Sequence, residues 1–527
     1  NLKLRGALSE DDFVAFTFSK RKIDNSWRDH NKFDSTQATL KYGHMFEDDS
    51  TLETEFSYTE SNMQLPATMN ASEFETFKET GSQHNTSSQW QNSGRDSKIF
   101  SINAKYEKEV GNTTFKPRIY FNTWEHFHPV TGMINDSNDN SVYGTDLELN
   151  NVHKLFGQKA TFVAGVTLKA DITNGAEKYK YADIVTAPKN LPYPPFTAYD
   201  EIQYTTSDNK GDLAQTEDST TILYGGYIME TFSPSNDFII DVSTRVDKLS
   251  FDISGNEISD YDYSFKRYIN GKGLYNIDKS YTLFSAKLGV VYKISKTTNI
   301  YASVATGNQA PTTSELGENE SLNKATSVNY EVGLKTRAKN FSADVAIYQN
   351  DVDDEIIQIK DANGNSIYDN AGKTQKRGLE VTAVYKPIES VQLGANYAYS
   401  DFKFVKFNES VSGSLVSRDG NYLPYIPKNM YSLFATYNMK NGFKSRISTK
   451  SWGKYFMDNA NTQEYDGYKF VTDIMLGYEK DAHNIQLNIN NITNQYYAME
   501  ALKDVYGNES YKAAAPVNGM LTYIYKF

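Results

Sequence analysis

The stretch that decides the fold is the last nine residues of the chain, Gly519-Met-Leu521-Thr-Tyr523-Ile-Tyr525-Lys-Phe527. Every second residue from position 521 is apolar or aromatic, which is typical of a strand with one oily face. Such an edge would aggregate unless another strand covered it. Closure of the sheet is the simplest remedy, because an unpaired backbone group in lipid costs several kcal/mol. We therefore assign Tyr523, Tyr525 and Phe527 to barrel closure and assembly.

Composition excludes several other classes. The chain has 527 residues, no Cys and a net charge of −12, which argues against a disulfide framework, a thiolate site or a nucleic-acid partner. Its mean hydropathy is −0.61, and it has no apolar run of about 18 residues, so a helical membrane protein is not expected. Its 39 Tyr against 4 Trp fit the aromatic girdles of an outer-membrane barrel.

Short and long connections alternate along the whole chain. The short turns fall near residues 9–12, 47–50, 111–112, 157–158, 233–236, 295–298, 338–339, 387–389, 440–442 and 480–483. The longer connections fall near residues 23–32, 63–95, 124–140, 172–217, 253–278, 307–325, 354–372, 403–426, 455–466 and 497–516. Together they join about 21 strands, and bacterial barrels have even strand numbers, short periplasmic turns and long extracellular loops.

This count predicts an all-β, transmembrane antiparallel β-barrel of 22 strands in the intact protein, with residues 1–527 forming the barrel domain. The first connection is short, so we expect the missing first strand before Asn1, together with an export signal. Barrels of this size have a plugged lumen. We therefore also expect an N-terminal plug domain upstream, because strands and loops use the whole chain.

Individual strands alternate between apolar and polar residues, as in Val328-Asn-Tyr330-Glu-Val332-Gly-Leu334. A β-sandwich would show the same period of two, with its apolar face in a core. The regular alternation of short and long connections favours the barrel, because a sandwich has no need of it.

Three segments of the second half carry a family resemblance. They read Gly307-Asn-Gln-Ala310-Pro311 before an acidic, Leu-containing loop, then Asn329-Tyr-Glu-Val-Gly-Leu-Lys335, and then Arg377-Gly-Leu-Glu380. In this order they resemble TonB-dependent outer-membrane receptors. The first half matches only in its rhythm of turns.

The resemblance implies active import of a scarce ligand, most readily a ferric siderophore, driven by the TonB complex acting on the plug. Gly307, Ala310 and Pro311 would form the family motif loop, although a loop that only caps the barrel mouth remains the alternative. The implied partners are outer-membrane lipid, the TonB complex, the outer-membrane assembly machinery and a small-molecule ligand. The resemblance further implies a monomer without a covalent cofactor, in the bacterial outer membrane. No enzyme motif stands out.

Candidate ligand-binding residues lie in two predicted loops. The 124–140 loop has Trp124, His126, Phe127, His128 and Met133, which could coordinate haem or a metal, stack on a planar ligand, or belong to an aromatic girdle. The 63–95 loop adds residues that would suit copper if the two loops converged, namely Met63, Met69, His84 and Trp90.

The ligand stays open at this point. Residues 312–325 contain no His, although haem receptors of the family usually carry one there. Only Arg95, Lys189 and Lys210 are candidates for holding an anionic siderophore. Haem, cobalamin and copper receptors therefore remain alternatives, as do a passive substrate-specific porin and a surface adhesin.

Overall fold

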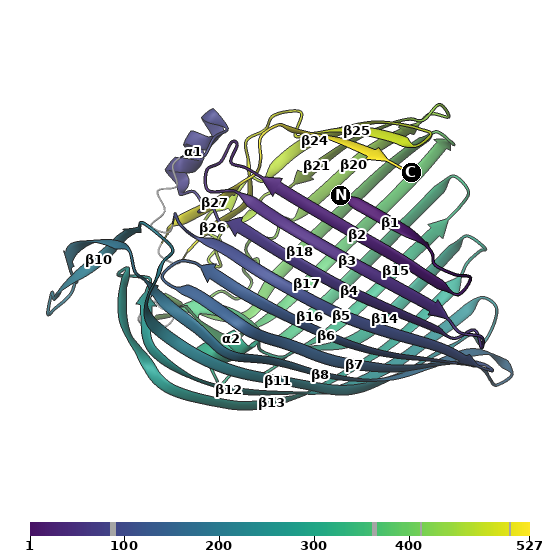
Figure 1. Ribbon diagram of the computed structural model, residues 1–527, viewed down its shortest axis with the longest axis horizontal. Helices are drawn as coiled ribbons and strands as arrows, with labels where there is room; N and C mark the ends of the chain where they lie inside the picture. Colours follow the sequence, from purple (N-terminus) through teal and green to yellow (C-terminus); the bar gives the residue numbers. More distant parts are fainter. Residues whose placement is uncertain (85–90, 361–365, 412–413, 505–506) are drawn as a thin grey trace.

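The computed structural model describes residues 1–84, 91–360, 366–411, 414–504 and 507–527, which form one main antiparallel sheet of 22 strands (Figure 1). Its first half consists of β1 (Leu2–Ala7), β2 (Asp12–Ile23), β3 (Phe33–Met45), β4 (Thr51–Gln64), β5 (Gly94–Val110), β6 (Thr113–Pro129), β7 (Ile134–Leu155), β8 (Gln158–Tyr181), β11 (Lys210–Phe232), β12 (Phe238–Asp262) and β13 (Arg267–Lys293). Its second half consists of β14 (Thr298–Gln309), β15 (Ala325–Arg337), β16 (Phe341–Lys360), β17 (Ser366–Ile388), β18 (Val391–Val411), β19 (Ser414–Ser417), β20 (Asn429–Asn438), β21 (Phe443–Trp452), β24 (Tyr468–Lys480), β25 (His483–Asn490) and β28 (Asn518–Tyr525).

The sheet is an up-and-down meander. Strand β19 pairs only with the outer end of β18, and setting it aside leaves 21 of the 22 strands, each paired with the next along the chain. Each of the ten predicted short turns joins two paired strands. The predicted barrel fold, with about 21 strands in this chain, is confirmed.

The alternation of residues places an apolar face outside and a polar face inside. On neighbouring strands β8 and β11, Val166 and Ile228 are 53% and 50% exposed. On the opposite face, the Tyr227 hydroxyl donates to a Glu148 carboxylate oxygen at 2.7 Å. Because side chains alternate across a strand, the outward set forms an apolar outer surface and the inward set faces the lumen.

Several strands extend further than the sequence analysis predicted. The predicted 124–140 loop is wrong, because β6 runs to Pro129 and β7 starts at Ile134, leaving only residues 130–133 as a connection. The predicted 253–278 loop likewise shrinks to residues 263–266 between β12 and β13. Polar composition misled the prediction, since a strand beyond the membrane can carry polar residues on both faces while its backbone ladder continues.

The remaining elements lie in the long connections at one end of the barrel (Figure 1). They are α1 (Ala71–Thr80), α2 (Thr313–Glu318) and three hairpins, β9 (Ile184–Asn190) with β10 (Ala198–Thr205), β22 (Tyr455–Phe456) with β23 (Glu464–Tyr465), and β26 (Ala498–Lys503) with β27 (Glu509–Ala513). Neither helix in the described part of the chain is long and apolar enough to cross a membrane.

Helix α1 has a clear local cause. The Asn70 side chain accepts from the Glu73 backbone N–H at 2.9 Å, and the Glu73 carboxylate accepts from the Asn70 N–H. This capping box satisfies two backbone donors at the helix start. The helix ends at Gly81, whose φ of 69° suits glycine. A Cβ at Gly81 would lie 2.6 Å from the Tyr496 ring, so the turn also needs glycine for close packing.

The two edge strands of the described sheet are β1 and β28, and the gap between them is called the seam here. Loops from both sides of the seam meet outside the membrane. Met69 and Tyr511 exchange backbone hydrogen bonds of 2.9 and 2.8 Å. They belong to a buried apolar group, the seam cluster, made of Met69, Phe74, Phe77, Tyr455, Met457, Ala498, Ala501, Tyr511 and Ala513. The sheet therefore curls until its two ends are joined by loop packing.

Candidate ligand-binding site at the outer end of the barrel

A cavity of about 590 Å³ lies on the inner wall at the loop end of the barrel. Its wall residues on β8, β11, β12 and β13, such as Thr173, Ser219 and Phe251, alternate with the lipid-facing residues and therefore face inward. Residues of β6 and β7 and the loop that carries α2 complete the lining. The cavity is within the range of about 300–1,000 Å³ that is typical of small-molecule sites.

Helix α2 and its N-terminal cap, which follow the Ala-Pro segment, form one side of this cavity. Gly307 is still part of β14, while Ala310 and Pro311 follow the strand directly. Thr312 then caps α2, since its hydroxyl accepts from the Glu315 N–H and its own N–H donates to the Glu315 carboxylate. This arrangement is a second capping box, which stops the chain from continuing as a strand.

Helix α2 is held against the inner wall by one fully buried side chain. Leu316 is packed against Phe251 and Ile253 of β12 and Ile277 of β13. Burial of a Leu side chain contributes about 1.5–3 kcal/mol. With the helix fixed in this way, Thr312, Thr313, Ser314 and Gly317 line the cavity.

The charged residues of the cavity lining are mostly acidic. Its charged residues are six carboxylates and two lysines, namely Asp136, Asp171, Glu177, Glu217, Glu257, Glu318, Lys178 and Lys272. Burial raises the pKa of Glu318, and nearby Lys272 and Lys178 only partly offset that effect. Burial also raises the pKa of Asp260, which lies near the end of β12.

Aromatic rings, hydroxyls, amides and a few aliphatic groups supply the rest of the surface. The Tyr275 hydroxyl donates to a Glu217 carboxylate oxygen at 2.6 Å and accepts from the Gln215 side chain at 2.7 Å. The ammonium of Lys272 lies 4.6 Å from the centroid of the Tyr275 ring and donates to the Gly317 carbonyl at 2.7 Å. Burial, followed by the bond to Glu217, raises the Tyr275 pKa, so the phenol stays a donor at neutral pH.

The family model for the β-barrel of TonB dependent receptor-like proteins matches residues 5–492. The chain belongs to this family. Barrels of the family are located in the outer membrane of Gram-negative bacteria. The apolar outer face described above is therefore in contact with outer-membrane lipid, and the loop end of this TonB-dependent receptor barrel faces the outside of the cell.

Two curated relatives and one crystal structure support this assignment. The chain is 28% identical over 139 residues to the ferrioxamine B receptor of Salmonella typhimurium, covering 25% of this chain and 19% of that protein. It is 22% identical over 317 residues to the probable TonB-dependent siderophore receptor PiuA of Acinetobacter baumannii, covering 57% and 40%. Its fold is similar to the crystal structure of PiuA, with a TM-score of 0.77 at 14% identity over 99% of this chain and 78% of that one. The matches span less than half the length of both curated relatives.

Among the predicted site residues of this TonB-dependent receptor barrel, Trp124 lines the cavity. Next along β6, the His126 ring lies 5.4 Å from Trp124 and 5.0 Å from His128 between ring centroids. These residues stand on the outer extension of a strand, so their predicted place in an irregular loop is wrong. Their alternation along β6 could not be recognised once the segment was taken as a loop.

Both histidines are held in the neutral form. Burial lowers the pKa of His126, with a further contribution from the Arg95 charge. Burial, together with the charges of His126 and Arg95, lowers the pKa of His128 to about 4. A neutral imidazole keeps one nitrogen free to accept or to coordinate.

Two other predicted residues have a packing role. Phe127 and Met133 belong to a second apolar group, the hairpin cluster, which holds the β9–β10 hairpin on the strands beneath it. Its buried members are Met133, Ile134, Tyr181, Ile202, Ala214 and Tyr261. Trp90 lies outside the described residues.

Three of the residues considered for copper, Met69, Met133 and His84, lie in separate places. Met69 is buried in the seam cluster, whereas Met133 is buried in the hairpin cluster. His84 lies near Asp29 instead, with 3.6 Å between Nδ1 and the carboxylate. The described part of the chain contains no group of three or more His, Cys, Asp or Glu that could hold a metal. Convergence was only a condition of the copper alternative, because loop composition does not encode three-dimensional placement.

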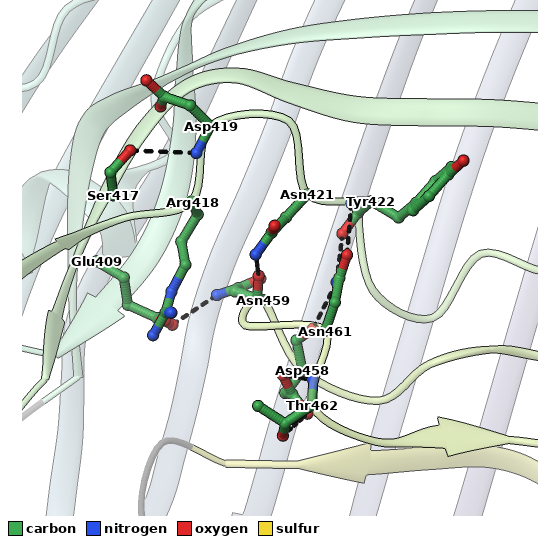
Figure 2. A network of polar contacts seen from close by, with 10 residues as sticks. All are labelled: Glu409, Ser417, Arg418, Asp419, Asn421, Tyr422, Asp458, Asn459, Asn461 and Thr462. Carbon is green, nitrogen blue, oxygen red and sulfur yellow. Dashed lines mark hydrogen bonds and ion pairs between the residues drawn. The ribbon is translucent and has the colours of Figure 1, made fainter.

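A polar network that the sequence analysis missed fixes two other outer loops to each other (Figure 2). Arg418 donates to one carboxylate oxygen of Glu409 at 2.8 Å, and Asn459 donates to the other at 2.7 Å. Glu409 is only 5% exposed. Asp458 closes the second loop by accepting from the backbone N–H and hydroxyl of Thr462 at 3.0 and 2.8 Å. The β18–β20 and β21–β24 connections therefore form one unit.

Proposed function

We propose that the protein is a TonB-coupled receptor that imports a ferric siderophore across the outer membrane without converting it chemically. The observation that carries this proposal is the cavity at the outer mouth of a barrel of this family, walled by inward-facing strand residues and by α2. Its mixed aromatic and hydroxyl lining suits a bulky organic chelate. The ferrioxamine and siderophore receptors among the relatives support the same ligand class.

The proposal includes a plug domain and one more barrel strand outside these 527 residues. Described strands β1 and β28 each pair on one side only, and an additional strand between them would bring the barrel to the even number typical of bacterial outer-membrane proteins. A plug in the lumen would carry the TonB-contacting segment. We propose that the whole receptor works as a monomer and reaches the membrane through the outer-membrane assembly machinery.

Within the site, we propose that Trp124 contacts the ligand directly. Its ring lines the cavity, whereas the neutral rings of His126 and His128 follow it on β6 and support its position. A buried aromatic contact contributes about 1.5–3 kcal/mol. Trp124→Ala should therefore weaken ligand binding on the order of tenfold to a hundredfold.

The test is an uptake assay in a strain that lacks the gene and is complemented with the full-length receptor. Ferric siderophores, haem, cobalamin and copper are offered separately, and Trp124→Ala is compared with Phe156→Ala. Phe156 is the matched control, because it is 87% exposed at a short turn on the opposite end of the barrel. Uptake of a ferric siderophore that requires TonB and is impaired only by Trp124→Ala is the expected result. Growth and uptake that do not depend on the gene for any of these compounds would refute the proposal.

A further inference from the structure

We propose that the cavity selects ferric complexes that carry no net negative charge, and that it favours those bearing an additional ammonium group. This inference rests on the proposed function, because it specifies the ligand class of the same site. It starts from the cavity wall, where carboxylates outnumber lysines by six to two. Three of the six, Asp136, Asp171 and Glu257, form ion pairs with lysines, which leaves Glu177, Glu217 and Glu318 to face a ligand.

Two carboxylates on the wall are bonded to neutral hydroxyls rather than to cations. Glu217 accepts from the Tyr275 hydroxyl at 2.6 Å, and Glu177 accepts from the Tyr179 hydroxyl at 2.5 Å. A neutral hydroxyl donor satisfies one lone pair of a carboxylate without neutralising its charge. These two positions therefore contribute negative potential to the cavity.

The cations nearby are largely committed to other partners. Lys210, a candidate for holding an anion, forms an ion pair with Asp136. Lys272 lies 3.7 Å from a Glu257 carboxylate oxygen and also donates to the Gly317 carbonyl. Lys189, on the β9–β10 hairpin, faces Glu201 at 3.9 Å. Lys178 also lines the cavity, and a single lysine is a small basic surface for a strongly anionic ligand.

Ferric complexes differ strongly in charge. Three catecholate groups bring six negative charges to Fe³⁺ and leave the complex at 3−, whereas three hydroxamate groups bring three and leave it neutral. Unlike charges attract and like charges repel most strongly where water is partly excluded, as in this cavity. An excess of carboxylates therefore weakens the binding of the tris-catecholate complex by repulsion and does not repel the neutral tris-hydroxamate complex.

An ammonium on the ligand would gain from the same field. Glu177, Glu217 and Glu318 come from three separate elements around the cavity, β8, β11 and α2, whereas Asp171 is already paired with Lys169 at 3.3 Å. Glu217 is bonded to the neutral Tyr275 hydroxyl, so a cationic group can approach it without displacing another cation. The acidic surface also raises the local concentration of cations at the mouth.

The experiment measures binding of three iron-loaded probes to the purified full-length receptor. They are a linear tris-hydroxamate with a terminal ammonium, the same compound with that amine acetylated, and a tris-catecholate. We expect the ammonium compound to bind most tightly, acetylation to weaken binding on the order of tenfold, and the catecholate to bind at least another tenfold more weakly. The double variant Glu217→Gln/Glu318→Gln should reduce the effect of acetylation, whereas Glu79→Gln on the exposed side of α1 should not.

The outcomes separate the two proposals. Tighter binding of the catecholate than of either hydroxamate would overturn the charge inference and leave siderophore transport intact. Equal affinity for the acetylated and unacetylated compounds would overturn the preference for an ammonium. Failure of every ferric complex to bind, together with no uptake in cells, would overturn the proposed function itself. The comparison of probes uses the wild-type receptor, so it remains decisive if the double variant does not assemble.

Discussion

Replacement of Phe77 by Ala would test whether the loops across the seam are held together by hydrophobic packing. Phe77 is fully buried in the seam cluster. Its ring centroid lies 5.7 Å from that of Trp27 and 5.6 Å from that of Tyr496. It therefore contacts loops from both sides of the seam. This cluster is outside lipid, so the full hydrophobic effect of water applies to it, unlike the outward face of the barrel.

The expected loss follows from the burial. Truncation of a fully buried Phe to Ala costs about 3–5 kcal/mol, including the cavity that remains. Each 1.4 kcal/mol is a factor of ten in an equilibrium constant. The open population of α1 and its loop should therefore rise between about a hundredfold and a few thousandfold. The barrel itself should keep its strand ladders, because none of the cluster residues lies in a membrane-spanning strand.

Trypsin cleavage after Lys78 measures that opening. Lys78 lies within α1, so the protease can cut there only when the helix unfolds locally. In Phe77→Ala the cleavage rate should rise with the open population, while the heat-modified mobility of the barrel on a denaturing gel should be unchanged. Ser72→Ala is the control, since it is an exposed residue of the same helix. An unchanged cleavage rate would refute the reasoning, as would the loss of the assembled barrel.

Three further changes probe other parts of the molecule. Arg418→Met should destabilise the paired outer loops by about 3–5 kcal/mol, because Glu409 remains buried without its cation. The double variant Glu409→Gln/Arg418→Met should recover most of that loss in the same protease assay. The His128 ring should titrate near pH 4 when followed by NMR. Because the folded state holds the neutral ring, its contribution to local stability is complete above about pH 6.5 and is lost as the pH falls toward 4, by up to about 3 kcal/mol. A titration midpoint near pH 6.5 would contradict this. Deletion of Phe527, which is 83% exposed, should reduce the amount of assembled receptor more than ligand affinity, and normal surface levels would count against its assembly role.

The transmembrane part was predictable because the bilayer imposes it. Lipid requires a closed ladder of backbone hydrogen bonds, and the same geometry requires one face to be apolar. The residues from Val328 to Leu334 show that alternation, and they form part of β15 as predicted. Short turns such as Gly111-Asn112 were recognisable for the same reason, since they interrupt the alternation after a fixed length.

The outer part was less predictable because water imposes no such pattern. The segment from Trp124 to Pro129 is polar and aromatic on both sides, and it was assigned to a loop although it continues β6. One missed element did carry a readable signal. Asn70 and Glu73 have the spacing of a capping box, and Phe74 and Phe77 follow at helical spacing. Convergence of separate loops, as in the seam cluster, leaves no trace in a single sequence.

The arrangement of the outer end separates support from recognition. The seam cluster and the network around Glu409 join loops to loops, and their residues are buried or paired within the protein. The cavity, in contrast, is built on strands whose ladders continue to the membrane, with α2 fixed beside them by Leu316. Sites carried by regular elements hold their side chains more rigidly than sites on loops alone. The charge pattern of the cavity is therefore set by the fold, so the proposed selectivity by charge requires no closure of the outer loops.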